Sequence, residues 1–167
     1  MAASTLYSNA HLSGICPDHC IPAGVVLSRT GRYLSVAECE ANSVIQLIPM
    51  PKGAQLLDLL ISWTALGSGV TIDVGITDTG YTGYDIDMFF DGLAAQYAGY
   101  ARWGAAMINA TAAACVHGAQ MLATTWPYEF TANGTIDVKI LGAVLPTAAT
   151  LTGVAIYKQE GAIDDET

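Results

Sequence analysis

Positive charge is scarce in this sequence, which carries six Lys and Arg residues against fifteen Asp and Glu, for a formal net charge of −9. A nucleic-acid-binding surface needs a cluster of basic side chains to neutralise a run of phosphates, and six scattered cations do not supply one. An anionic membrane surface is disfavoured for the same reason. We therefore expect neither nucleic acid nor a membrane among the partners.

Charge of either sign is also scarce. Charged residues make up 13% of the chain and hydrophobic residues 52%, whereas an average soluble domain is roughly 25% charged. So few charges leave little polar material to cover the surface of a lone monomer. Part of the apolar excess is therefore expected to lie against other protein surfaces.

Long hydrophobic runs are missing. No stretch approaches the ~18 apolar residues of a membrane span, and residues 1–5 lack the basic start and apolar run of a secretory signal. We therefore expect the protein to be made in a reducing cytoplasm, where its four cysteines need not form disulfides.

The chain does contain period-two alternation, which is typical of β-strands with one buried face. Apolar residues occupy every second position in 70–76, 126–130 and 135–140, and Gly and Pro interrupt the chain every dozen residues or so. Further strands are expected at 23–29, 32–37, 44–49, 55–65 and 150–158. About eight short antiparallel strands predict an all-β fold, a jelly-roll-like β-sandwich.

Matching apolar faces predicts how some strands pair. A four-residue loop from Leu66 to Gly69 would place Trp63 opposite Ile72, so the strands on either side would form one hairpin. A three-residue loop at 132–134 would likewise pair Phe130 with Ile136 in a second hairpin.

Local signals predict two smaller features. Thr30-Gly31 is expected to be a turn between the strands at 23–29 and 32–37. Asp91 could cap one short helix over Gly92–Ala98, because Leu, Ala and Gln follow it. The remainder of 92–123 is rich in Ala and could be strand, loop or helix.

These signals divide the chain into three parts. Residues 1–22 are polar and unpatterned, which predicts an extended N-terminal arm. Residues 23–159 hold the sandwich, and residues 160–167 form an acidic C-terminal tail.

The most metal-like set of side chains is Cys16, His19 and Cys20, with Cys39 further along. Three thiolates and an imidazole could bind zinc tetrahedrally, but no second paired motif follows. Free cysteines, and a disulfide formed after lysis, are the other interpretations. We therefore expect no cofactor, with these four residues as a weak metal candidate.

Other constellations point to no definite chemistry. Five carboxylates could bind calcium or simply be solvated, and they lack the spacing of an EF-hand: Asp73, Asp78, Asp85, Asp87 and Asp91. Cys115 and His117 could share a strand face, yet no oxyanion donor can be named beside them. With no nucleophile in a recognisable motif, we predict that the chain is not an enzyme.

Four tyrosines and a tryptophan lie close together in the sequence among Gly and Ala: Tyr81, Tyr84, Tyr97, Tyr100 and Trp103. Such rings either pack in a core, form a protein interface or stack on sugar rings. They are our candidate interface residues.

Three segments carry a resemblance to a known family. They are Ile45–Ala54 leading into the strand that reaches Trp63, then Gly69–Asp78, then Asp87–Leu93, with a weaker echo in Thr135–Ile140 and Leu151–Tyr157. Together they resemble the small jelly-roll proteins that cement or decorate the capsids of tailed bacteriophages.

The resemblance implies a structural protein on the capsid surface of a virion, made in the host bacterial cytoplasm. Its partners would be the major capsid protein and further copies of itself, with a trimer as the implied oligomer. A receptor- or glycan-binding module of a fibre or tail is the first alternative, and a hydrolase of unrecognised type the second.

Overall fold

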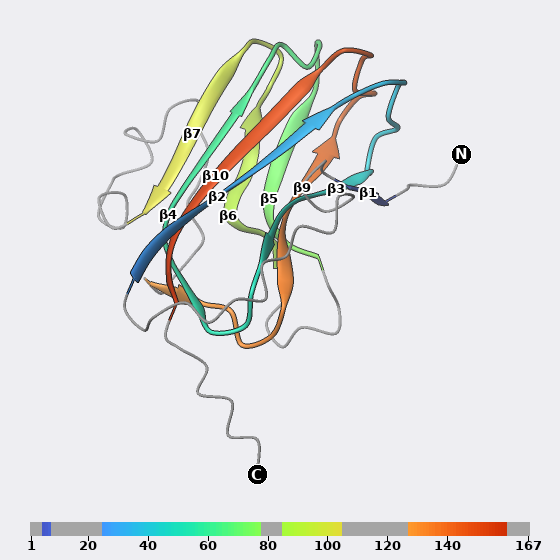
Figure 1. The fold of residues 1–167 in the computed structure, drawn as a ribbon. Helices are drawn as coiled ribbons and strands as arrows, with labels where there is room; N and C mark the ends of the chain where they lie inside the picture. Colours follow the sequence, from blue (N-terminus) through green and yellow to red (C-terminus); the bar gives the residue numbers. More distant parts are fainter. Residues whose placement is uncertain (1–4, 8–24, 78–84, 105–126, 160–167) are drawn as a thin grey trace.

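The computed structural model describes residues 5–7, 25–77, 85–104 and 127–159, which form two β-sheets packed face to face (Figure 1). Within these ranges there is no helix, and so none that could cross a membrane. The strands are β1 (Thr5–Tyr7), β2 (Val25–Leu34), β3 (Val44–Met50), β4 (Ala54–Trp63), β5 (Thr71–Ile76), β6 (Asp85–Ala94), β7 (Gly99–Gly104), β8 (Tyr128–Glu129), β9 (Gly134–Leu141) and β10 (Thr150–Gln159).

The strand order identifies the fold as a jelly roll. Sheet A has the order β1-β3-β9-β5-β6 and sheet B the order β2-β10-β4-β7, with β8 added beside β4. The antiparallel pairs are nested: β2 with β10, β3 with β9, β4 with β7 and β5 with β6. The chain is thus one long hairpin, rolled up by the further pairs β10–β4 and β9–β5. The predicted fold class is confirmed.

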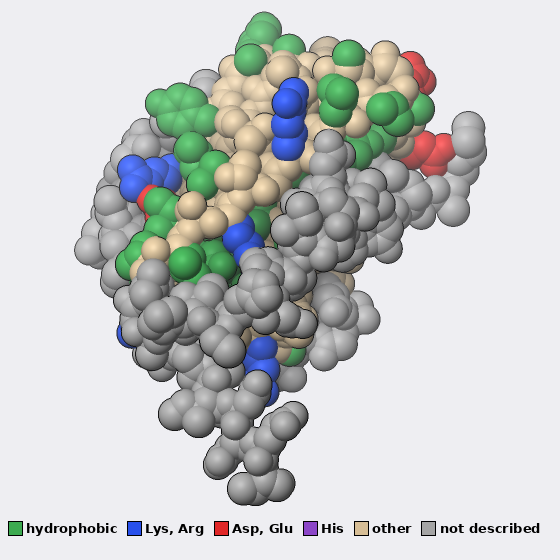
Figure 2. Space-filling model, in the orientation of Figure 1, with side chains coloured by type: hydrophobic (Ala, Val, Ile, Leu, Met, Phe, Trp, Pro, Cys, Tyr) green, Lys and Arg blue, Asp and Glu red, His purple; other side chains and the backbone are tan. Residues whose placement is uncertain are grey.

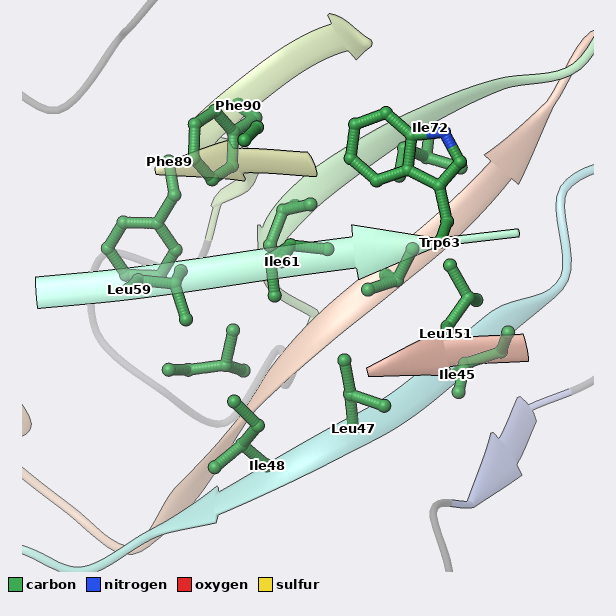
Figure 3. Packing of buried hydrophobic residues seen from close by; sticks show 14 of the residues in the cluster. Ile45, Leu47, Ile48, Leu59, Ile61, Trp63, Ile72, Phe89, Phe90 and Leu151 are labelled. Carbon is green, nitrogen blue, oxygen red and sulfur yellow. The ribbon is translucent and has the colours of Figure 1, made fainter. Parts of the chain in front are cut away.

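The core lies between the sheets and is built from every second side chain of the long strands. In Figure 3, Leu59, Ile61 and Trp63 of β4 follow one strand of sheet B, while Ile45 and Ile72 come from sheet A. All five are buried, with exposed fractions of 4% or less. Burying one such side chain contributes about 1.5–3 kcal/mol before ordering costs, and these five belong to a larger buried cluster drawn from both sheets.

Both predicted hairpins are wrong. Trp63 and Ile72 are buried as expected, but β4 belongs to sheet B and β5 to sheet A, and β8 and β9 are divided in the same way. The loops at 66–69 and 132–134 therefore lead from one sheet to the other. Two strands that face each other across a core bring their apolar rows together just as two paired strands do, so face matching cannot separate the cases.

The predicted turn at Thr30-Gly31 is also wrong, because β2 runs without a break from Val25 to Leu34. Gly31 serves a close contact between the sheets: a Cβ there would lie 1.8 Å from the carbonyl oxygen of Leu47 in β3. A glycine inside a strand often marks such an approach of another backbone.

The predicted helix over residues 92–98 is absent. β6 continues to Ala94, where Leu93 pairs with Ile72 and is fully buried, and a bend follows at 96–98. Strand pairing and burial override the local helix propensity of Leu93 and its neighbours.

Of the predicted N-terminal arm, the described part is β1, which adds to the edge of sheet A by pairing in parallel with Val44–Gln46. The rest of the arm and the tail at 160–167 lie outside the described residues. The three-part division of the chain stays a prediction.

Candidate docking surface

The outer surface of sheet B, here called the sheet B face, gathers exposed apolar side chains. Along β2 every second residue from Val26 to Leu34 is exposed, as alternation in a strand with one buried face requires. Exposed large hydrophobic side chains on this face are Val26, Leu34, Leu60 and Tyr100, with exposed fractions between 37% and 60%. Figure 2 shows largely green and tan surface here, with isolated blue side chains.

The charges on the sheet B face are few and partly paired. Arg102 of β7 donates from Nε to both carboxylate oxygens of Asp58 in β4, at 2.9 Å each. Its Nη2 also donates to Oδ2 of Asp58. These hydrogen bonds, and then the charge of Asp58, raise the pKa of Arg102 above its usual value. The other outward charges on the long strands are Arg32 and Lys158. With Arg102 and Asp58 cancelling, Arg32 and Lys158 positive and Glu129 of β8 negative, this face carries about +1, although the whole chain carries −9.

The predicted aromatic contact residues differ in their exposure to solvent. Tyr97 and Tyr100 are 75% and 60% exposed, at the bend before β7 and on β7 itself. The backbone of Tyr97 is held in place, because its carbonyl oxygen accepts a hydrogen bond from Trp63 Nε1 at 2.9 Å. Tyr81 and Tyr84 lie outside the described residues.

Trp103 lies in the core and not on the surface. Its side chain is fully buried and packs edge-on against Phe89, with ring centroids 5.1 Å apart. It can support the sheet B face from beneath, but it offers no exposed area to a partner.

Sequence reasoning missed the aliphatic part of this surface. Leu60 occupies the polar row of its strand, between Asp58 and Ser62, and that misplacement was a readable signal. The exposure of Val26 and Leu34 on one strand face could not be predicted in this way, because the expected turn at Thr30-Gly31 divided their strand in two. Val36 and Val144, which are 88% and 49% exposed, lie in the loops after β2 and before β10.

No protein-family model matches this chain, and no curated protein sequence matches it. Its fold, however, occurs in solved structures of phage capsids. One, "Capsid of Ralstonia phage GP4", aligns over 95% of this chain and 99% of its own, with a TM-score of 0.65 and 17% identity. Another, "Cyanophage Pam1 capsid asymmetric unit", aligns over 86% and 91%, with a TM-score of 0.53 and 14% identity. At these identities the likeness concerns the fold alone.

Of the four candidate metal ligands, Cys39 is among the described residues, whereas Cys16, His19 and Cys20 lie outside them. The Cys39 thiol is buried and lies 3.0 Å from the hydroxyl oxygen of Tyr33. Burial first, and then this thiol, raise the pKa of Tyr33 above its usual value. Among the described residues no group of three or more His, Cys, Asp or Glu could hold a metal ion.

The outer side of sheet A carries carboxylates, and those on β5 and β9, Asp73 and Asp137, are buried. Asp73 is 6% exposed and accepts a hydrogen bond from the Gly92 amide at 2.9 Å. Burial raises its pKa and the charges of Asp91 and Asp87 add to the rise, while the Gly92 hydrogen bond and, less strongly, Lys139 oppose it. Of the five carboxylates considered for calcium, Asp78 lies outside the described residues, and the described ones belong to no group of three or more that could hold a metal ion.

A hollow of about 280 Å³ lies on the same surface, lined by Val44, Thr77, Asp85, Ile86 and Lys139. The start of β6 crosses over β5 beside it, since a Cβ on Gly75 would lie 2.1 Å from the carbonyl oxygen of Asp85. Asp137, which pairs with Gly75, is fully buried and accepts a hydrogen bond from the Thr77 amide at 3.0 Å. The carboxylate thus fastens the end of β5 to β9.

Proposed function

We propose that this chain is a structural protein of a phage virion, which binds the outside of the capsid and stabilises the shell. The proposal is supported by the jelly roll that it shares with a chain in a phage capsid structure, over 95% of one and 99% of the other. Two chains that cover one another so completely are of similar length. The likeness therefore extends over nearly the whole of both chains.

The single observation that carries the docking part of the proposal is the sheet B face. It combines exposed Leu60 and Tyr100 with a neutralised Arg102–Asp58 pair, on a chain with a large net negative charge. Low charge and exposed aromatic area are typical of the centre of protein interfaces. We propose that this face lies against the major capsid protein, with sheet A on the side away from the shell.

Stabilisation would be mechanical. Apolar area buried between the protein and the shell contributes about 25 cal/mol per Å² before the costs of association are subtracted. One copy would therefore bind modestly. Copies that also associate with one another would bind as a set, because each bound copy raises the effective concentration of the next.

The test is binding to capsids that lack this protein. Purified chain is mixed with such capsids and sedimented, and shell stability is measured as the temperature at which packaged DNA becomes accessible to a dye. We expect saturable binding at many copies per particle and a higher release temperature. No saturable binding, or binding with an unchanged release temperature, would overturn the proposal.

A matched pair of variants tests the face. Leu60→Lys with Tyr100→Lys places two cations on the sheet B face, and Ala132→Lys with Thr147→Lys places two in exposed loops. We expect the first to lose capsid binding and the second to keep it. Equal loss in both would mean that charge, and not this face, governs binding.

The exposed rings of Tyr97 and Tyr100 also favour the alternative of a glycan-binding module, since both could stack on sugar rings. The same protein is therefore tested against immobilised host glycans. Saturable glycan binding that is lost in Tyr97→Ala with Tyr100→Ala, together with no capsid binding, would support the alternative.

A further inference from the structure

β2 is a long, regular strand at the edge of sheet B. It pairs with β10 through ten consecutive residues without a bulge, and no described strand pairs with its other side. At the edge of sheet A, by contrast, β6 is interrupted by two register shifts. Natural proteins usually protect a long edge with a bulge, a proline or inward charges, because an open edge invites pairing with another chain. β2 has no bulge and no proline, and its one inward charge, Arg29, donates to the Pro49 carbonyl at 2.8 Å inside the same chain.

The exposed residues of β2 are arranged symmetrically. Along its outer face run Val26, Ser28, Thr30, Arg32 and Leu34, so the two exposed hydrophobic side chains stand four residues to either side of Thr30. Val26 is 60% exposed and Leu34 is 45% exposed. A strand with this pattern is complementary to a second copy of itself running antiparallel.

One register satisfies the whole pattern. With Thr30 opposite Thr30 of the second copy, Val26 lies opposite Leu34 and Ser28 lies opposite Arg32, each twice. Directly opposed apolar pairs stabilise antiparallel strands, and like charges directly opposite destabilise them. A register centred on Arg29 or Arg32 would oppose two arginines, and one centred on Gly31 would leave Val26 without Leu34.

We infer that β2 binds β2 of a second copy of this chain in this register, so that two sheets B join into one continuous sheet across a two-fold axis. The two sheet B faces then merge into one surface. The contact closes at two copies, as isologous contacts do. A trimer, which the family resemblance implies, would need a different surface, and the present inference does not depend on capsid binding.

Cysteine cross-linking tests the register in the free protein. Cys16, Cys20 and Cys115 are first replaced by Ser, which leaves the buried Cys39. Thr30→Cys then places two cysteines directly opposite each other, with Cα atoms about 4.5–5.5 Å apart, within disulfide range. Ser28→Cys is the matched control on the same face, because its two copies would be about 14 Å apart along the strands.

We expect Thr30→Cys to form a disulfide-linked dimer under mild oxidation, Ser28→Cys to remain monomeric on a denaturing gel, and Ser28→Cys with Arg32→Cys to recover the dimer. Cross-linking of Thr30→Cys no faster than Ser28→Cys would overturn the register. A β2 edge covered by another part of the same chain would give that result too.

Solution mass provides the second readout. Sedimentation of the wild type is expected to give the mass of two chains, and Val26→Lys with Leu34→Lys to give one. Val36→Lys changes a more exposed hydrophobic residue beyond the paired strand and should keep the dimer. Circular dichroism verifies that each variant is folded. A wild-type monomer, or an oligomer that the double variant leaves intact, would overturn the inference.

Discussion

Gly31 and Gly153 lie directly opposite each other in the β2–β10 ladder and form a notch in sheet B that receives β3. A Cβ on Gly31 would lie 1.8 Å from the backbone oxygen of Leu47. On Gly153 it would meet side-chain tips, Ile48 Cδ1 at 2.7 Å and Leu47 Cδ2 at 2.9 Å. One glycine faces a rigid backbone and the other faces side chains that can rotate.

This difference predicts unequal costs for the same substitution. Gly31→Ala must displace the backbone of β3 and should lower the free energy of unfolding by about 3 kcal/mol or more, the upper end of overpacking losses. Gly153→Ala requires rotamer changes only and should cost about 1 kcal/mol. Urea unfolding of both variants measures the difference. Equal losses would show that β3 adjusts as readily as its side chains.

Two core tryptophans in the described part of the chain form a second matched pair. Trp63 Nε1 donates to the Tyr97 carbonyl at 2.9 Å, whereas Trp103 Nε1 is buried with no hydrogen-bond partner among the described residues. Trp63→Phe therefore loses ring volume and a hydrogen bond, and Trp103→Phe loses volume but also removes an unpaired donor. We expect Trp63→Phe to cost about 1–3 kcal/mol more in urea unfolding. The reverse order would mean that Trp103 Nε1 has a partner.

The buried carboxylate on sheet A predicts a pH dependence. Burial raises the pKa of Asp73 in the folded state, so between its unfolded and folded pKa values the native state binds more protons than the unfolded state. The contribution of Asp73 to stability is therefore most favourable below its unfolded pKa, and it decreases as pH rises through the folded pKa.

Asp73→Asn tests this sign, because its amide oxygen can still accept the hydrogen bond from Gly92. We expect the variant to be at least as stable as the wild type at pH 7, with the difference shrinking as pH falls toward 4, in urea unfolding at several pH values. A variant that is less stable at pH 7 would instead show that the carboxylate gains more from Lys139 than it loses by burial.

Strands could be predicted from the sequence where local patterns determine the outcome. Alternation at 70–76 and 135–140 marks strands, and it holds because one face of each strand must be buried. Pairing failed at Trp63 and Ile72, since their contact arises from the packing of two sheets, which alternation does not encode. The turn predicted at Gly31 is wrong for a related reason. The role of this glycine is set by Leu47, which lies sixteen residues further along the chain and in the other sheet.

The candidate surface was predictable to a similar extent. Tyr97 and Tyr100 were identified because clustered aromatic residues stand out in a sequence. Trp103 belonged to the same cluster, but strand alternation turns it inward, next to Phe89. Leu60 becomes informative only when its strand is known to present that side to solvent.

Removing one charge of the Arg102–Asp58 pair should affect capsid binding much more than the stability of the fold. Arg102 is 63% exposed and Asp58 16%, and exposed ion pairs contribute about 0–1 kcal/mol because solvent screens them. Asp58→Ala should therefore change the free energy of unfolding little, yet it leaves an uncompensated cation on the sheet B face. If this face lies against a capsid, desolvating that cation weakens binding, so we expect reduced co-sedimentation with capsids from a stably folded variant.

Arg102→Ala with Asp58→Ala removes both charges and should restore binding. A double variant that binds no better than Asp58→Ala would place Arg102 outside the interface.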